Sequence, residues 1–164
     1  MLFLADLQLH FHQTCDRIPS HQCFYWRNEL GNYILSFTFQ FDEQERYEFA
    51  YCYPYTYSTM QQYIHNLPLE LVTHQVIGHT LQKRNLDLLT VGTGDRTVVV
   101  MARVHPGETP ASFIMEGFLD FVTNQDCALA AFLREKATLK IVPMLNPDGV
   151  ALGNYRHGQA LIEV

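Results

Sequence analysis

Residues 96–110, RTVVVMARVHPGETP, form the stretch that decides the fold. It begins as a run of β-branched and other apolar residues, which is typical of a strand buried on both faces under helices. The run ends abruptly in His-Pro-Gly-Glu, and a helical pattern follows. Because α/β folds place their chemistry at the carboxyl ends of such strands, we expect a functional site at this crossing from strand to loop.

His105 and Glu108 are the candidate functional side chains at this crossing. Pro106 and Gly107 between them turn the chain sharply, so that both side chains can converge on one point. An imidazole nitrogen and a carboxylate oxygen supply two protein ligands of a catalytic zinc site of the two-His, one-Glu type, and a third must come from elsewhere. The alternative is a polar turn, in which the imidazole donates to a backbone carbonyl and the carboxylate caps the next helix.

Composition indicates a well-buried globular protein. The 164 residues are 48% hydrophobic and 17% charged, which excludes disorder and allows one full core or parts of two domains. The net charge is −6 and the sequence has no cluster of Lys and Arg, so we expect neither nucleic acid nor a membrane as partner. No stretch approaches the roughly 20 apolar residues of a membrane span.

The cysteines and the amino terminus favour an intracellular protein. The four cysteines are scattered without a C-x-x-C pair, which is typical of reduced thiols. Residues 1–9 are too short for a secretory leader, and Asp6 interrupts them. A zinc cluster of Cys15, His21 and Cys23 fits no known spacing, so structural or buried thiols are the favoured interpretation.

The first third of the chain has the pattern of an antiparallel β-structure. We expect a strand over 23–27, a turn over 28–32, an alternating strand over 33–41 and another strand over 47–53. Together these strands predict a meander with one packed face. Pro54 ends the pattern, and we place a domain junction near residues 54–58.

The rest of the chain alternates between helical and strand-like patterns, which predicts an α/β domain. We expect helices over 59–67, 69–81, 126–136 and from Pro110 onwards, and strands over 86–91, 96–104 and 138–145. Ser58 and Thr109 are the expected helix caps, and residues 92–95 are an expected hairpin turn. The expected core stripe of the Pro110 helix is Phe113, Ile114, Gly117, Phe118, Phe121 and Val122.

Several segments together carry a family resemblance. RVHPGETPAS at 103–112, PMLNPDGV at 143–150 and GNYR at 153–156 closely resemble the cytosolic carboxypeptidases, a branch of the zinc metallocarboxypeptidases. YCYPYTY at 51–57 and NLDLLT at 85–90 resemble the junction between the β-sandwich domain and the catalytic domain of that branch. Most of the chain is therefore similar to one family.

The resemblance implies a fold and a domain division. Residues 56–164 would be the first half of a mixed-sheet α/β carboxypeptidase domain. Residues 1–55 would be the carboxyl-terminal part of an antiparallel β-sandwich domain. The chain would then be a fragment whose open strand edge makes it poorly soluble.

Carried over by position, the resemblance makes His105 and Glu108 the first two zinc ligands, and Arg156 the arginine that stabilises the oxyanion. A guanidinium beside a zinc-polarised carbonyl offsets charge that develops only in the transition state. The alternative for Arg156 is a surface ion pair, which would contribute little. Asp148 is expected to lock the 146–149 turn. Three further features of the family have no counterpart here: the histidine that is the third zinc ligand, the glutamate that is the general base, and the Asn-Arg pair. His157 does not match that histidine.

The function implied by the resemblance is a cytoplasmic zinc metallocarboxypeptidase. Its substrates would be carboxyl-terminal or side-chain-linked glutamates on protein tails, with polyglutamylated tubulin as the named case. The chain alone would be inactive, because the third zinc ligand and the general base are missing. Two alternatives remain open, a zinc deacylase of the aspartoacylase type and a non-catalytic fragment that only binds a partner. Zinc affinity separates the non-catalytic fragment from an enzyme, since two ligands hold the metal weakly and a complete site holds it tightly.

Overall fold

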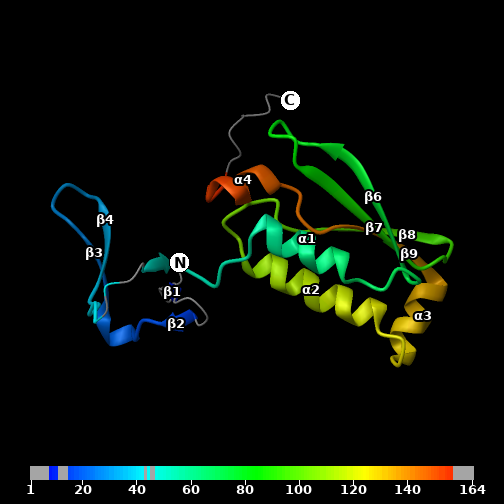
Figure 1. The fold of residues 1–164 in the computed structure, drawn as a ribbon, viewed down its shortest axis with the longest axis horizontal. Coiled ribbons are helices and arrows are strands. Elements are labelled where there is room, and N and C mark those ends of the chain that lie inside the picture. Colours follow the sequence, from blue (N-terminus) through cyan, green and yellow to red (C-terminus); the bar gives the residue numbers. More distant parts are fainter. Residues whose placement is uncertain (1–7, 11–14, 43, 45–46, 157–164) are drawn as a thin grey trace. The chain divides into compact units, whose positions relative to one another are not determined.

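The computed structural model describes residues 8–10, 15–42, 44 and 47–156. His157 lies outside these residues. Most of residues 1–9, on which the expectation of no secretory leader rests, also lie outside them. The chain forms two compact units, Met1–Pro54 and Tyr55–Val164 (Figure 1). Within the described ranges, no helix has the length and hydropathy needed to cross a membrane.

Unit 1, Met1–Pro54, contains two small antiparallel sheets. One sheet has the strand order β2-β1-β5 and the other pairs β3 with β4. The elements are β1 Gln8–His10, β2 Cys15–Arg17, the 3-10 helix η1 Ser20–Gln22, β3 Cys23–Arg27, β4 Tyr33–Phe37 and β5 Glu48–Ala50. The predicted strand, turn and strand over 23–37 are confirmed as the β3–β4 hairpin, whose turn contains Gly31 at a φ of 82°.

The predicted meander is wrong beyond this hairpin. β4 ends at Phe37, and β5 pairs with β1 instead of β4. The later members of the alternating pattern, Phe39 and Phe41, lie in a loop, where their rings pack edge-on against Tyr47 at centroid distances of 5.3 and 5.0 Å. Tyr33, at the other end of the predicted packed face, is 65% exposed. Ring packing, which needs no strand ladder, therefore accounts for part of the aromatic pattern.

Unit 2, Tyr55–Val164, contains a four-stranded mixed sheet with the strand order β6-β7-β9-β8. Only the β8–β9 pair is parallel among these neighbours. The elements are α1 Tyr57–His65, β6 Val72–His79, β7 Asn85–Val91, β8 Arg96–Met101, α2 Pro110–Thr123, α3 Ala128–Lys136, β9 Ala137–Val142 and α4 Pro147–Leu152. Helices α1 and α2 lie side by side (Figure 1), and the Tyr63 hydroxyl of α1 donates to Asp120 of α2 at 2.6 Å. The mixed α/β fold agrees with the prediction.

The strand connections of unit 2 differ from the prediction in two places. The expected helix over 69–81 is the strand β6, whose β-branched residues pair with β7 across a hairpin closed by the Thr80 amide and the Arg84 carbonyl at 2.9 Å. The expected hairpin turn over 92–95 is a crossover, because β9 lies between β7 and β8. Sheet order depends on contacts distant in sequence, so a local turn signal does not determine it.

The strand β8 lies at an edge of the described sheet, with β9 as its hydrogen-bonded neighbour there. Val98, Val99 and Met101 are exposed to 44%, 60% and 55%. The predicted burial of this strand on both faces is therefore wrong for the sheet that the structure describes. The strand is apolar as predicted, but no described element covers these three side chains.

Both predicted caps differ in the structure. α1 begins at Tyr57, and Thr56, not Ser58, caps it by accepting a hydrogen bond from the Thr59 amide at 3.1 Å. α2 begins at Pro110 as predicted, but Thr109 makes no side-chain cap. The predicted helix over 126–136 is confirmed as α3, which begins two residues later at Ala128.

The buried stripe of α2 is also displaced from the predicted one. Phe113 and Ile114 are exposed to 44% and 72%, although Val122 is buried as predicted. The buried members of the helix are Ser112, Met115, Leu119, Val122 and Thr123. Phe118 and Phe121 of the predicted stripe are partly buried and pack against the core, so the prediction holds for the second half of the helix and fails for Phe113 and Ile114.

Candidate metal and catalytic site

The site lies where the parallel strands β8 and β9 end side by side. Beyond the strands, the Ala102 amide donates to the Val142 carbonyl at 3.1 Å, and the Leu145 amide donates to the Ala102 carbonyl at 3.0 Å. The Asn146 amide then donates to the Arg103 carbonyl at 3.2 Å. These bonds continue the parallel ladder and bring the two sequence motifs, HPGE and NPDG, to the same end of the sheet.

The His105 and Glu108 side chains meet, as the sequence predicts. His105 Nδ1 lies 3.2 Å from Glu108 Oε1, and the turn between them is closed by the Glu108 amide, which donates to the His105 carbonyl at 3.1 Å. The two side chains are 34% and 54% exposed, so a ligand from solvent can reach them. In the alternative of a polar turn, the imidazole bonds to a backbone carbonyl, whereas in the structure its Nδ1 lies at hydrogen-bond distance from the Glu108 carboxylate.

The donor set and its spacing fit zinc. Two donors that bind one zinc ion at about 2.0–2.1 Å in tetrahedral geometry lie about 3.3 Å apart. The distance between His105 Nδ1 and Glu108 Oε1 matches this value. In the described ranges, no group of three His, Cys, Asp or Glu side chains is close enough to hold one metal ion.

Close packing against α4 fixes the turn that carries these two side chains. A Cβ at Gly149 would lie 2.6 Å from Pro106 Cγ, so only glycine permits this approach. Asn146 caps α4 by accepting a hydrogen bond from the Gly149 amide at 3.0 Å. The NPDG segment, predicted to be a tight turn, is therefore the cap and first turn of a helix that supports Pro106.

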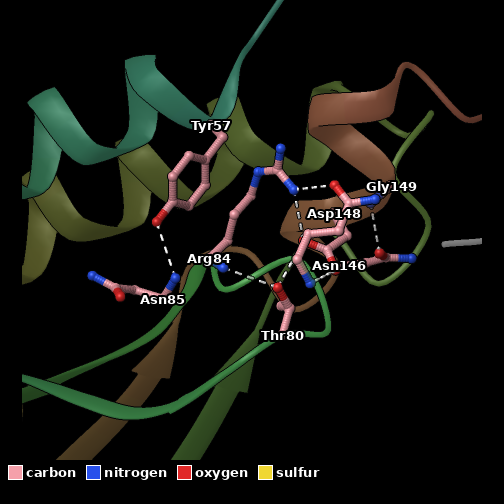
Figure 2. Close-up of polar contacts among 8 residues, drawn as sticks. Tyr57, Thr80, Arg84, Asn85, Asn146, Asp148 and Gly149 are labelled. Carbon is pink, nitrogen blue, oxygen red and sulfur yellow. Dashed lines mark hydrogen bonds and ion pairs between the residues drawn. The ribbon is translucent and has the colours of Figure 1, made fainter. Parts of the chain in front are cut away.

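Asp148 connects α4 to the distant β6–β7 hairpin (Figure 2). Its carboxylate accepts hydrogen bonds from Thr80 Oγ1 at 2.7 Å, from the Gln82 amide at 3.2 Å and from Arg84 Nη1 at 2.8 Å. Asp148, expected from the sequence to lock its own turn, instead holds a turn from elsewhere in the chain. Burial acts to raise the pKa of Asp148, but the hydrogen bonds from Thr80, Arg84 and Gln82 and the charge of Arg84 outweigh it, so the pKa is lowered.

The segment that contains Arg156 lies against the same turn. The Gly107 amide donates to the Tyr155 carbonyl at 2.7 Å, and a Cβ at Gly107 would lie 2.7 Å from that carbonyl oxygen and 2.9 Å from Tyr155 Cα. Gly153, in the left-handed region at a φ of 71°, ends α4 and directs the chain there. Arg156 follows directly and is exposed. The structure thus brings the HPGE and GNYR motifs together.

Arg103 also belongs to this site, and it is not among the site residues predicted from the sequence. It is 4% exposed and has a φ of 54°, in the left-handed region that L-residues with side chains rarely adopt. Its guanidinium donates to groups on both sides of Glu108. The available signal was an arginine at the end of an apolar run, directly before the HPGE motif.

The sequence profile of the zinc carboxypeptidase family matches residues 56–160. The chain belongs to the zinc carboxypeptidase family. Within it, the chain is 44% identical over 154 residues to cytosolic carboxypeptidase 6 of Homo sapiens, covering 85% of this chain and 30% of that protein. It is 39% identical over 173 residues to cytosolic carboxypeptidase 3 of Mus musculus, covering 94% and 17%. The predicted resemblance to this branch is confirmed.

Solved carboxypeptidase structures share the fold of this family member. A putative carboxypeptidase A from Shewanella denitrificans superposes with a TM-score of 0.77 at 31% identity, covering 94% of this chain and 40% of that chain. A metallo-carboxypeptidase from Pseudomonas aeruginosa, in complex with (2-guanidinoethylmercapto)succinic acid, gives 0.76 at 27% identity with the same coverage. The chain spans less than a third of the length of the two curated relatives above.

Proposed function

We propose that this chain forms part of a cytoplasmic zinc metallocarboxypeptidase that removes carboxyl-terminal or side-chain-linked glutamates from protein tails, with polyglutamylated tubulin as the leading substrate. Residues 56–164 form the first half of the catalytic domain, and residues 1–55 belong to a preceding β-sandwich domain. Family membership and the similarity to cytosolic carboxypeptidases 6 and 3 support the proposal. The family match also favours a carboxypeptidase over the deacylase alternative.

The chain contributes three groups to the reaction. His105 and Glu108 would hold zinc, which, when bound, supplies a Lewis acid and lowers the pKa of a bound water. The Arg156 guanidinium offsets the negative charge that develops on the oxygen of the scissile carbonyl. The Gly107–Tyr155 hydrogen bond keeps the Arg156 segment beside the two zinc-binding side chains.

The observation that carries the proposal is the 3.2 Å distance between His105 Nδ1 and Glu108 Oε1 at the end of β8. The test is zinc affinity, measured on the purified chain by competition with a chromophoric chelator. We expect weak binding that His105→Ala and Glu108→Gln each reduce by at least about tenfold. His79→Ala removes an exposed imidazole on β6 and is the matched control, which should leave the affinity unchanged. If neither His105→Ala nor Glu108→Gln changed the zinc affinity, the metal site would be refuted.

The chain by itself is proposed to be inactive. Two zinc ligands and one arginine supply neither a third protein ligand nor a general base, and the reaction needs both. Incubation of the purified chain with zinc and a glutamylated peptide should release glutamate no faster than the His105→Ala variant does. Turnover well above that variant would contradict the inactivity, and it would show that other residues complete the site.

A further inference from the structure

We propose that Arg103 is a positioning residue, which holds the turn between the two zinc-binding side chains in its ligand geometry. The proposal rests on the proposed zinc site. The Arg103 Nε–H donates to the Pro106 carbonyl at 2.9 Å, and this carbonyl lies between His105 and Glu108 in the chain. A displacement of Pro106 changes the separation of the two side chains, and therefore their fit to one metal ion.

The other acceptors of the guanidinium surround the same turn. Arg103 Nη2 donates to Thr109 Oγ1 at 3.2 Å, and Nη1 donates to Ser112 Oγ at 2.7 Å, both at the start of α2. Nη1 also donates to the Tyr55 carbonyl at 3.3 Å, at the beginning of unit 2. A planar guanidinium has several donors in fixed directions, so it can bind these groups at once, whereas an ammonium group has a single donor centre.

The backbone conformation of Arg103 indicates that its surroundings hold the residue in place. Its φ of 54° is unfavourable for a residue with a side chain, and such conformations persist only where the surroundings enforce them. The other described non-glycine residue with positive φ is Lys83, which lies in the β6–β7 hairpin, where turns commonly require it. Arg103 instead follows the end of β8 at Met101, and its side chain bonds to the Pro106 carbonyl of the 105–108 turn.

A buried guanidinium needs hydrogen-bond acceptors of this kind, because burying a charge without hydrogen bonds is costly. The four acceptors named above belong to the turn, to the start of α2 and to the segment at Tyr55. A role in stability alone is the competing explanation. The two roles differ in one measurable respect, since only a positioning role links the guanidinium to metal affinity beyond its effect on folding.

The experiment compares two arginines that each hold one end of α2. Arg103 acts at the amino-terminal end, and Arg134 donates from α3 to the carbonyls of Val122 and Asn124 at the other end, at 2.7 and 3.1 Å. Arg103→Lys and Arg134→Lys keep the charge and remove the guanidinium. Zinc affinity is measured by chelator competition and the melting temperature by circular dichroism without metal, with wild-type chain and His105→Ala alongside.

We expect Arg103→Lys to raise the zinc dissociation constant at least about tenfold, the usual effect of losing a residue that orients metal ligands. Arg134→Lys should lower the melting temperature to a similar extent and change the dissociation constant less than about twofold. Ser112→Ala removes one acceptor of the guanidinium and keeps the arginine, so it replaces Arg103→Lys as the test variant if Arg103→Lys does not fold. It should raise the dissociation constant about threefold.

The outcomes separate the two proposals. Wild-type zinc affinity in Arg103→Lys, together with a loss in His105→Ala, overturns the positioning role and leaves the proposed function standing. Equal losses in Arg103→Lys and Arg134→Lys also overturn it, because zinc affinity would then follow stability alone. An affinity that His105→Ala does not change removes the zinc site itself, and with it any role for Arg103 there.

Discussion

Unit 2 buries a continuous apolar core, whereas unit 1 leaves many of its aromatic side chains half exposed. In unit 2, Leu89, Val122 and Ile141 are fully inaccessible to solvent. In unit 1, Phe24 and Trp26 on β3 are both more than half exposed. The neighbouring Tyr25 points to the opposite face of the strand and is exposed as well. A high aromatic content in the sequence therefore does not by itself indicate burial.

The two units are also stabilised by different contacts. The core of unit 1 is a small cluster around Ile18, and its described aromatic rings add edge-on pairs such as Phe39–Tyr47 at a centroid distance of 5.3 Å. Each such pair contributes about 0.5–1.5 kcal/mol. Unit 2 combines a larger apolar cluster with a four-stranded sheet. Since buried apolar area is the dominant stabilising contribution, we expect unit 2 to be the more stable unit.

The largest predicted effect tests this difference in the cores. Leu89→Ala should lower the free energy of unfolding of unit 2 by about 3 kcal/mol, because it leaves a cavity at a fully buried position. Leu69→Ala makes the same chemical change at a side chain that is 82% exposed, and it should cost no more than about 0.5 kcal/mol. Urea unfolding followed by circular dichroism measures both.

The independence of the two units is checked by the corresponding change in unit 1. Ile18→Ala should destabilise unit 1 and leave the urea midpoint of the unit 2 transition in place. Hydrogen exchange resolved by residue assigns each transition to its unit. A shift of the unit 2 midpoint comparable to that of Leu89→Ala would show that the two units unfold as one, which contradicts their independence.

The second prediction concerns pH and is confined to unit 2. The lowered pKa of Asp148 means that its carboxylate stabilises the fold above the ordinary value of 3.8, and that this contribution is lost as the pH falls through the folded pKa. Asp148→Asn should cost about 2 kcal/mol at pH 7, since it removes a charge that accepts three hydrogen bonds. It should also flatten the acid limb of the stability curve below about pH 4.

Asp126→Asn is the control for this prediction, because Asp126 is exposed on the segment before α3. Urea midpoints measured from pH 2 to pH 7 should be lower for Asp148→Asn than for Asp126→Asn, with the difference shrinking toward acid pH. An unchanged difference across this range would mean that the Asp148 carboxylate and its partner Arg84 contribute nothing that titrates.

The parts of the site that could be predicted from the sequence are those fixed by local signals. The HPGE turn after an apolar run and the proline at the start of α2 are read within a few residues. The meeting of His105 and Glu108 follows from that turn alone. Arg156, placed by the family resemblance, is exposed, and its catalytic role stays a prediction.

The parts that could not be predicted depend on partners distant in sequence. Asp148 binds Thr80, which is 68 residues away, and no local pattern identifies that partner. The strand β6 was mistaken for a helix because its pattern is weak, and its pairing with β7 decides its structure. The order of the sheet, with β9 between β7 and β8, is likewise a property of the assembled core.

The smallest predicted effect lies at the first helix of unit 2, where sequence and structure disagree about the cap. Thr56→Ala should cost about 1 kcal/mol, because Thr56 Oγ1 accepts the Thr59 amide at the start of α1. Ser58→Ala should be neutral or stabilise by a few tenths of a kcal/mol, because alanine favours a helix interior more than serine does. Urea unfolding of unit 2 separates the two variants. If Ser58→Ala were the more costly change, α1 would begin later than the structure shows, and the cap predicted from the sequence would be correct.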